Sequence, residues 1–405
     1  MRRPLSRTLA LQGLQGAPGA LARRARAMPS LDLRFAETKS LTDWISGQDL
    51  MTFSRASSGT FTDSAGILQT AAVNSRRIDH NPLTGECLGL LVEEQRTNLV
   101  TSSATFQPSS AGNPASYTVD QVAPDGTTTA SRQTAANPRT FIDYQGIANA
   151  QYTFSVYAKA ASGTATIALQ LKNAASDTVI ATESYVTLTA AWRRLTVTGT
   201  TNGATAGARI EVIGPVVGAP SGTVFWGAQL EAGAFPTSYI PTTTATVTRS
   251  ADVASITGSN FSSFASTSTH TLFAEIQRSS AVNVNTLVAA LSDGATNNRI
   301  SLRLDANGTT STFVGVNSGT LDGVVQVTTG VAGSVIRQAG AAEVNNYQLA
   351  ANGMLGTADT TVLIPTVNQL EIGQVAATAQ FNGTIRRLTY WPQRLPNNSL
   401  VAITR

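Results

Sequence analysis

The chain has 405 residues, of which 42% are hydrophobic and only 13% are charged. This length exceeds one ordinary domain, and the scarcity of charged residues argues against long helices with solvated surfaces. No run of about 18 apolar residues occurs, so we expect a soluble protein without a membrane-spanning helix. The chain is instead rich in Thr, Ser, Ala, Gly and Val, which favour strands and tight turns, so the expected fold class is all-β.

The formal net charge of +4 is concentrated at the N-terminus. Residues 1–28 carry six arginines and no acidic residue, and +4 less +6 leaves about −2 on the rest. We therefore expect no basic stripe on the folded part and no nucleic-acid partner. The apolar residues of this segment are too interrupted for a secretion signal, so we predict that residues 1–29 form a basic flexible arm. Two alternatives stay open: a short triple helix over the Gly-X-Y triplets at 13–21, and an internal start at Met28.

Residues 30–100 contain short strand patterns separated by turns, and we predict a small β module. Glu93 and Glu94 invite a catalytic interpretation, but neighbours on a strand point to opposite faces and do not share a cleft. We predict instead an ion pair between one of them and an arginine nearby, namely Arg55, Arg76 or Arg77. His80 is expected to support the turn at Asn81-Pro82. The single Cys87 excludes an intrachain disulfide and is expected to be a buried, small apolar residue.

Residues 101–246 show the period-two alternation of a β-sandwich. Tyr152, Phe154 and Val156 alternate with polar side chains, and Asn202-Gly203 is a hairpin turn. A last strand at 224–230 closes the domain, with four residues expected on one face: Val224, Trp226, Ala228 and Leu230. Trp226 is therefore predicted to lie in the core, whereas Trp192 stands at a loop–strand border and could serve either core or ligand.

Residues 247–405 repeat this logic. His270, Leu272, Ala274 and Ile276 share one face of a predicted strand, so His270 is expected to be a core or sheet-edge side chain. The alternating residues of 300–304 predict a second strand, which Asn307-Gly308 ends with a turn. The sequence thus predicts tandem antiparallel β-sandwiches behind a small N-terminal module.

Several motifs carry a family resemblance. WGAQLEAGAFPTSYIPT (226–242) and VTRSADV (247–253) resemble a segment that recurs in head-spike or fibre proteins of phages, prophages and gene-transfer-agent-like particles. Residues 30–100 resemble the N-terminal module of the same proteins, with RAS, DSAG, DHNPLTGE and GLLVEEQRTNL. The middle region looks like carbohydrate-binding jelly rolls. The ANG, LEIG and FNGTIRRLTYW motifs of 247–405 resemble concanavalin A-like or laminin G-like lectin domains.

The resemblance implies a structural spike or fibre exposed on a virion. It implies a homo-oligomer, a trimer or a pentamer, that contacts capsid or tail proteins and binds host-surface polysaccharide for adsorption, without membrane insertion. Glucanases with a lectin-like fold carry a motif similar to E-I-D-x-x-E. At the corresponding place this chain has Glu275, but Gln277 replaces the Asp and Ser279 replaces the second Glu. We therefore expect no enzyme and no catalytic residue. A glycan-degrading tail spike and a capsid decoration protein without a ligand remain alternatives.

Lectin sites pair a flat aromatic ring with amides and carboxylates, because rings stack on sugar C–H faces while hydroxyls need polar partners. No cofactor is expected, but a Ca²⁺ site would need oxygens from separate loops, for which Asp293, Asp305 and Asp322 are candidates. The predicted ligand-binding residues are Trp391, Tyr390, Arg394, Asn297, Asn298, Asp293 and Trp192.

Overall fold

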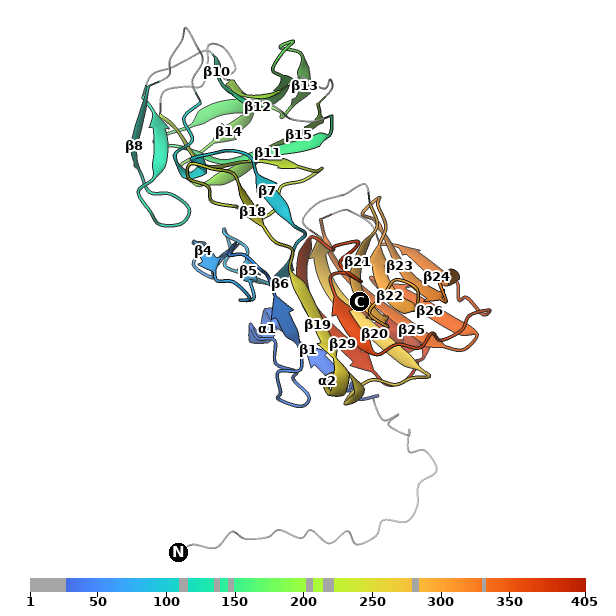
Figure 1. Cartoon of the computed structure of the whole chain (residues 1–405). Coiled ribbons are helices and arrows are strands. Elements are labelled where there is room, and N and C mark those ends of the chain that lie inside the picture. Colours follow the sequence, from blue (N-terminus) through green and yellow to red (C-terminus); the bar gives the residue numbers. More distant parts are fainter. Residues whose placement is uncertain are drawn as a thin grey trace, which may run out of the picture.

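The structure is a computed structural model that describes residues 27–108, 116–134, 139–144, 149–201, 207–213, 222–278, 284–329 and 333–405. It confirms the all-β fold class: two antiparallel β-sandwiches form the two lobes of Figure 1. Nearly all of the predicted arm, including the Gly-X-Y triplets, lies outside the described residues, as do the Asn202-Gly203 turn and Ser279. None of the described helices is both long and apolar enough to span a membrane.

The middle region forms one lobe, the sandwich predicted from its alternating residues. One sheet has the order β10 (Arg139–Tyr144), β16 (Ala208–Ile213), β12 (Ala165–Asn173) and β13 (Val179–Thr182), with β14 (Val186–Leu188) also paired to β12. The other has the order β15 (Arg193–Thr200), β11 (Gln151–Ala160), β17 (Thr223–Ala232), β9 (Ala130–Gln133) and β8 (Tyr117–Gln121). The alternating apolar residues of both sheets meet in one core, which the short helix η1 (Ser103–Thr105) adjoins.

The predicted face of β17 is wrong at one point. Between Trp226 and Gln229 the register against β11 shifts, and Gly227 there has φ of +64°. Such a bulge adds one residue to the strand and reverses which face the following side chains occupy. Ala228 and Leu230 therefore face the sandwich core, whereas Trp226 packs with Val224 in a separate cluster on the other face. Trp226 is nevertheless buried, as predicted.

The second lobe is a larger sandwich. Its eight-stranded sheet has the order β27 (Met354–Leu355), β26 (Asn346–Ala351), β25 (Val335–Glu343), β20 (His270–Arg278), β29 (Gly383–Trp391), β6 (Cys87–Val92) and β5 (Ile78–His80), with β1 (Leu31–Leu33) also on β29. Its seven-stranded sheet has the order β2 (Thr52–Ser54), β19 (Val253–Thr257), β28 (Gln369–Ile372), β21 (Thr286–Ser292), β22 (Arg299–Leu304), β23 (Thr310–Asn317) and β24 (Thr320–Thr328). Helices α1 (Phe35–Thr38), α2 (Gly258–Ser262) and α3 (Asn397–Ile403) are short.

Residues 30–100 contribute strands to both sheets of this second lobe, although the sequence was interpreted as a separate module. Leu31 lies opposite Tyr390, Leu91 opposite Thr384, and Phe53 opposite Ala254. Figure 1 shows the blue strands β1 and β6 beside β29. The hairpin of β3 (Gly59–Thr62) and β4 (Leu68–Ala71) pairs apart from the large sheets, and so does the strand at Arg96–Asn98. Alternating apolar and polar residues indicate which face of a strand is buried but not which strand it pairs with. The sequence analysis therefore did not predict these pairings.

The middle sandwich is thus inserted into the second one. The chain leaves the second sandwich through β7 (Arg96–Asn98) and returns through β18 (Val247–Arg249), which pair antiparallel to each other. Asn98 ties this junction to the middle sandwich, because its Nδ2 donates to the carbonyl oxygens of Ala228 and Ile240 at 3.1 and 2.9 Å. Both ends of the insertion therefore lie side by side.

Candidate functional site

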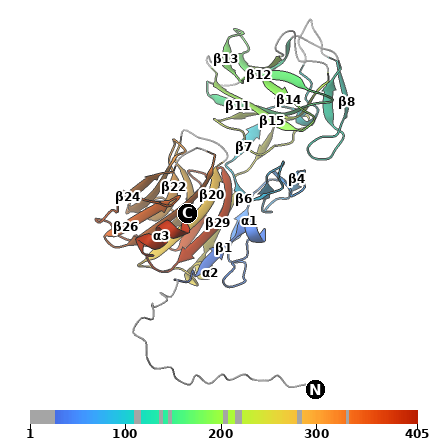
Figure 2. The ribbon, with the colours of Figure 1, turned by 180° about the vertical axis from the view of Figure 1, so that it is seen from behind.

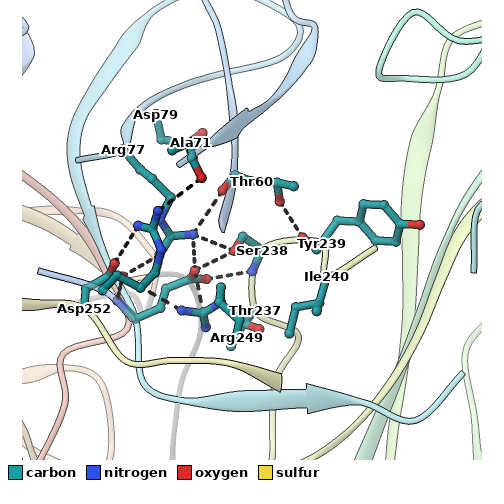
Figure 3. Close-up of polar contacts among 12 residues, drawn as sticks. Thr60, Ala71, Arg77, Asp79, Thr237, Ser238, Tyr239, Ile240, Arg249 and Asp252 are labelled. Atoms are coloured by element: carbon teal, nitrogen blue, oxygen red, sulfur yellow. Dashed lines mark hydrogen bonds and ion pairs between the residues drawn. The ribbon is translucent and has the colours of Figure 1, made fainter. Parts of the chain in front are cut away.

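Five buried charged side chains meet at the junction of the two sandwiches. Nη1 of Arg77 donates to Oε2 of Glu93 at 2.7 Å, and Arg77 also binds Asp252. Nη1 of Arg55 reaches Oδ1 of Asp252 at 3.1 Å, and Arg249 lies 3.5 Å from Glu93. Figure 3 shows the labelled side chains of Arg77, Arg249 and Asp252 converging on one another. We call Arg55, Arg77, Glu93, Arg249 and Asp252 the junction cluster.

The junction cluster confirms the predicted ion pair, with Arg77 as the partner and Glu93 as the carboxylate. Burial alone would raise the pKa of Glu93, but Arg249, Arg77 and the hydrogen bonds from Ser238 lower it to about 2. Burial likewise opposes the charge on Arg77, and Asp252 and Glu93 outweigh it, so that the pKa of Arg77 is raised. Every carboxylate here is occupied by the protein itself. The cluster is therefore a structural connection between segments rather than a site for a ligand.

The two aromatic residues predicted for the C-terminal strand have different positions. Tyr390 is fully buried, because the alternation of β29 turns it into the core, where it packs on Phe264 and His270. Its prediction as an exposed ligand-binding residue is wrong. Trp391 is 8% exposed and faces the opposite side of the sheet, where its Nε1 donates to the carbonyl of Ala27.

The polar candidates do not gather into one site with these rings. Asp293, Asn297 and Asn298 share the turn between β21 and β22, and Nδ2 of Asn298 donates to Asp293 at 2.8 Å. Arg394 lies after β29, where it donates to the side chains of Asn346 and Asn397.

The three aspartates considered for Ca²⁺ each bind groups of the protein. Oδ1 of Asp305 accepts from Arg303 and Thr312, whereas Asp322 accepts from the backbone of Leu363. Asp293 is held by Asn298. Within the described ranges, no three His, Cys, Asp or Glu side chains come together in a way that could hold a metal ion.

Trp192, the predicted candidate in the middle sandwich, is half-buried, with Nζ of Lys159 4.8 Å from its ring centroid. Trp192 belongs to the middle sandwich, whereas the other predicted ligand-binding residues belong to the second sandwich. His270 is buried as predicted, and burial lowers its pKa to about 4. Cys87 is half-buried against the core of the second sandwich. His80 contacts β3 rather than the turn, with Nδ1 3.1 Å from the carbonyl of Thr62.

A second group of charged residues lies on the outer face of the eight-stranded sheet, and the sequence analysis missed it. Ile385 and Leu388 of β29 point into the core, which leaves two residues between them. The register against β20 shifts at this point, so β29 has a bulge, and both Arg386 and Arg387 face outward. The bulge thus places two guanidinium groups side by side on the outer face of the sheet.

These arginines line a hollow that we call the outer trough. Its larger part has a volume of about 580 Å³; its floor holds Asp32, Phe273 and Trp391, and its walls include Trp44 and α3. Arg34 and Arg387 also line a second hollow of about 370 Å³ with Glu86, Glu275 and Arg386, so the two parts adjoin at these arginines. Figure 2 shows α3, β29, β1 and α1 following one another across this side of the lobe.

Asp32 organises the larger part of the trough. Its carboxylate is buried and binds Nε of Arg34 at 2.7 Å and both Nε and Nη2 of Arg387 at 2.7 and 2.8 Å. Trp44 on the wall is 56% exposed, and the guanidinium of Arg34 lies 4.5 Å from its ring centroid. The trough therefore offers an exposed flat ring beside two oriented guanidinium groups, a combination that can stack on a sugar and bind its oxygens.

No protein-family model matches the chain, and neither does any curated protein. Parts of the fold are similar to solved structures. The CBM40 domain of an IT-sialidase from Ruminococcus gnavus, bound to α2,3-sialyllactose, is 19% identical over 34% of this chain and 83% of that chain, with a TM-score of 0.30. Domain 4 of AbnA, a GH43 extracellular arabinanase from Geobacillus stearothermophilus, in complex with arabinotriose, is 12% identical over 42% and 82%, with a TM-score of 0.31. The heptameric SAP-like pentraxin from Limulus polyphemus is 12% identical over 34% and 70%, with a TM-score of 0.28.

Proposed function

We propose that this protein binds glycans in the outer trough. The observation that carries the proposal is the exposed ring of Trp44 beside Arg34 and Arg387, in a hollow large enough for a sugar residue. Aromatic rings stack on the apolar faces of sugars, and guanidinium groups donate hydrogen bonds to sugar oxygens. Trp391 and Phe273 extend the apolar floor below them.

We further propose that the protein binds without cleaving. Hydrolysis of a glycosidic bond needs two carboxyl groups on either side of it, one to donate a proton and one to attack or to activate water. Asp32, on the floor, is held by Arg34, Arg387 and Thr389. Glu275, in the second part, lies between Arg337 and Arg386 at 3.3 and 3.4 Å. Such pairing occupies both carboxylates with arginines of the protein itself and favours a binding role.

The setting that we propose is a spike or fibre on a phage or phage-like particle, where the trough would hold the particle to polysaccharide of the host surface. The motifs at 226–242 and 247–253 support this setting through their resemblance to virion proteins. Repeated copies on one particle would convert weak single-site binding into avidity. Gold-labelled antibodies against the protein, viewed on purified particles by electron microscopy, test the location: label confined to lysate debris contradicts it.

The binding proposal is tested on the purified full chain with an array of bacterial surface polysaccharides. We expect Trp44→Ala to reduce binding about tenfold, which corresponds to about 1.4 kcal/mol, because it removes the ring on which the apolar face of a sugar would stack. Trp192→Ala is the matched control, because it removes a half-buried ring from the other sandwich and should leave binding unchanged.

Three outcomes of this test have distinct meanings. Loss of binding with Trp192→Ala instead of Trp44→Ala would move the site to the middle sandwich. If the protein shortens the polysaccharide, as measured by gel filtration, the alternative of a glycan-degrading tail spike would be favoured. Absence of binding to every polysaccharide of the array would favour a decoration protein without a ligand.

A further inference from the structure

We infer that the outer trough selects glycans that carry a negatively charged group, a carboxylate or a sulfate, on the sugar beside Trp44. This inference rests on the proposed glycan binding and specifies the class of ligand. It comes from the hydrogen-bonding capacity that Asp32, Arg34 and Arg387 have left after binding one another.

The only carboxylate that lines the larger part of the trough, as far as the described residues go, has no capacity left for a sugar. Oδ1 of Asp32 accepts from Nε of Arg387 at 2.7 Å and from Oγ1 of Thr389 at 2.9 Å. Oδ2 accepts from Nε of Arg34 at 2.7 Å and from Nη2 of Arg387 at 2.8 Å. A carboxylate has about four lone-pair sites, and all four are used. Asp32 therefore orients the arginines and cannot accept hydrogen bonds from sugar hydroxyls.

The arginines, in contrast, keep donors free. Nη2 of Arg34 and Nη1 of Arg387 have no hydrogen-bond partner within the described part of the chain, and neither atom is among the buried polar atoms without a partner. Both side chains are partly exposed, at 22% and 38%. The trough thus presents guanidinium donors next to an exposed ring, and a ligand that satisfies them must bring acceptors. A carboxylate or sulfate adds the attraction of opposite charges to these hydrogen bonds and matches the guanidinium geometry.

The charge balance favours the same end of the trough. The lining of the larger part of the trough holds two guanidinium groups and one carboxylate, that of Asp32. The buried carboxylate of Asp43 does not line it and accepts from the backbone of Asp32 and from Ile45 and Ser46. Arg34 also approaches Glu37 at 3.3 Å, but Glu37 is 63% exposed, and such surface pairs contribute little. At the second hollow, Arg386 and Arg337 balance Glu86 and Glu275. An acidic sugar is therefore expected beside Trp44, with neutral sugars toward Arg386.

The first test uses pairs of ligands with the same sugar backbone, of which one member carries the charged group and the other does not, and it needs no variant. Isothermal titration of the full chain compares polygalacturonate with its fully methyl-esterified form, and dextran sulfate with dextran. The host-surface polysaccharide that binds best on the array is compared with its carboxyl-reduced form. We expect each neutral partner to bind at least tenfold more weakly, which corresponds to one charge-assisted hydrogen bond. Whichever charged member binds identifies a carboxylate or a sulfate as the preferred group.

A pair of variants then locates the effect. Arg34→Gln should weaken binding of the charged partner at least tenfold and binding of the neutral partner much less, so that the preference between the two disappears. Arg132→Gln is the control, because it removes an exposed arginine of the middle sandwich, 33% exposed and paired with Asp120. Equal affinity for charged and neutral partners would overturn the inference while glycan binding stands. No binding to any member of the pairs would count against the proposed function itself, and an equal loss in both variants would show non-specific charge attraction and overturn the inference.

Discussion

The junction cluster and the outer trough are both built from arginines paired with carboxylates, but the first is closed to solvent and the second is open to it. In the junction cluster three arginines and two carboxylates are buried and pair with one another, and the two donors left without a partner among the described residues, Nε of Arg77 and Nε of Arg249, are buried as well. In the trough, Asp32 is equally buried, but the arginines that it holds remain partly exposed and keep free donors. The comparison shows that ion pairing alone does not distinguish a structural site from a binding site. The two regions differ in whether the donors left over lie at the surface, where a ligand could reach them, or are buried.

Both regions join residues that are distant in the sequence. The largest expected effect on folding therefore comes from separating these residues by truncation. A fragment of residues 247–405, the predicted third domain, keeps Arg249 and Asp252 but lacks Arg55, Arg77 and Glu93. It also lacks β1 and β6, which pair with β29. We expect this fragment to remain unfolded, which circular dichroism and proton NMR would show.

The matched design removes the insertion instead. Residues 27–98 joined by a short Gly/Ser linker to 247–405 retain the cluster, the trough and the β7–β18 pair. This chain is expected to fold and to bind glycans as the full protein does. A folded 247–405 fragment with glycan affinity would show that the N-terminal strands are dispensable and would remove the basis for comparing the two regions.

The second prediction breaks the cluster alone. Arg77→Gln leaves Glu93 and Asp252 buried without their shared partner, and such loss of one member of a buried pair costs about 3–5 kcal/mol. Urea denaturation followed by tryptophan fluorescence measures this change in the free energy of unfolding. A loss below about 1 kcal/mol would mean that Arg55 and Arg249 compensate for Arg77. The cluster would then contribute no more to the free energy of unfolding than exposed ion pairs do.

The third prediction uses acid to separate the buried charges from a buried neutral group. His270 is fully buried, neither ring nitrogen has a hydrogen-bond partner among the described residues, and burial lowers its pKa to about 4. A depressed folded-state pKa contributes stability above the unfolded value of about 6.5 and loses it as the pH falls toward 4. His270→Phe should therefore gain stability relative to the wild type as the pH falls, by about 2 kcal/mol at pH 5.

Glu93 provides the internal comparison for this measurement. Its pKa of about 2 lies below its ordinary value of 4.5, so the stability from its charge is present above pH 4.5 and is lost only toward pH 2. Denaturation midpoints of the wild type and His270→Phe from pH 7 to pH 3 should diverge mainly between pH 6.5 and pH 4. Parallel curves over that range would show that His270 does not account for the acid sensitivity.

The junction cluster could be predicted from the sequence better than the outer trough, because the pairing of Glu93 has a signal in the neighbouring residues. The Arg77–Glu93 pair could be anticipated because adjacent glutamates on a strand cannot share a cleft, so that one of them needs an internal partner. The trough could not be anticipated in the same way, since Asp32 and Arg387 are brought together by the β1–β29 pairing. One signal was present: two arginines between the inward residues Ile385 and Leu388 break the alternation and indicate a bulge.

The aromatic residues illustrate the same limit. Tyr390 and Trp391 are neighbours, so alternation requires that one faces the core and the other the outer surface, but it does not say which. The inward Leu388 decides the matter, because Tyr390 lies two residues beyond it on the same face. Trp44 follows no strand pattern at all, and only the fold places its exposed ring beside Arg34.

The smallest expected effect on stability completes the comparison. Arg386→Gln makes the same chemical change as Arg77→Gln, but Arg386 pairs with Glu86, which is 55% exposed, and with Glu275, which Arg337 also approaches. Exposed pairs contribute about 0–1 kcal/mol, so the free energy of unfolding should change by less than about 1 kcal/mol. Because Arg386 lines the second part of the trough, the affinity for a long glycan should nevertheless fall severalfold, whereas a single sugar bound beside Trp44 should be unaffected. Calorimetric titration with a monosaccharide and with an oligosaccharide of the same sugar separates these effects. An Arg386→Gln variant as unstable as Arg77→Gln, with unchanged affinity, would place Arg386 among the structural residues and limit the binding site to the surroundings of Trp44.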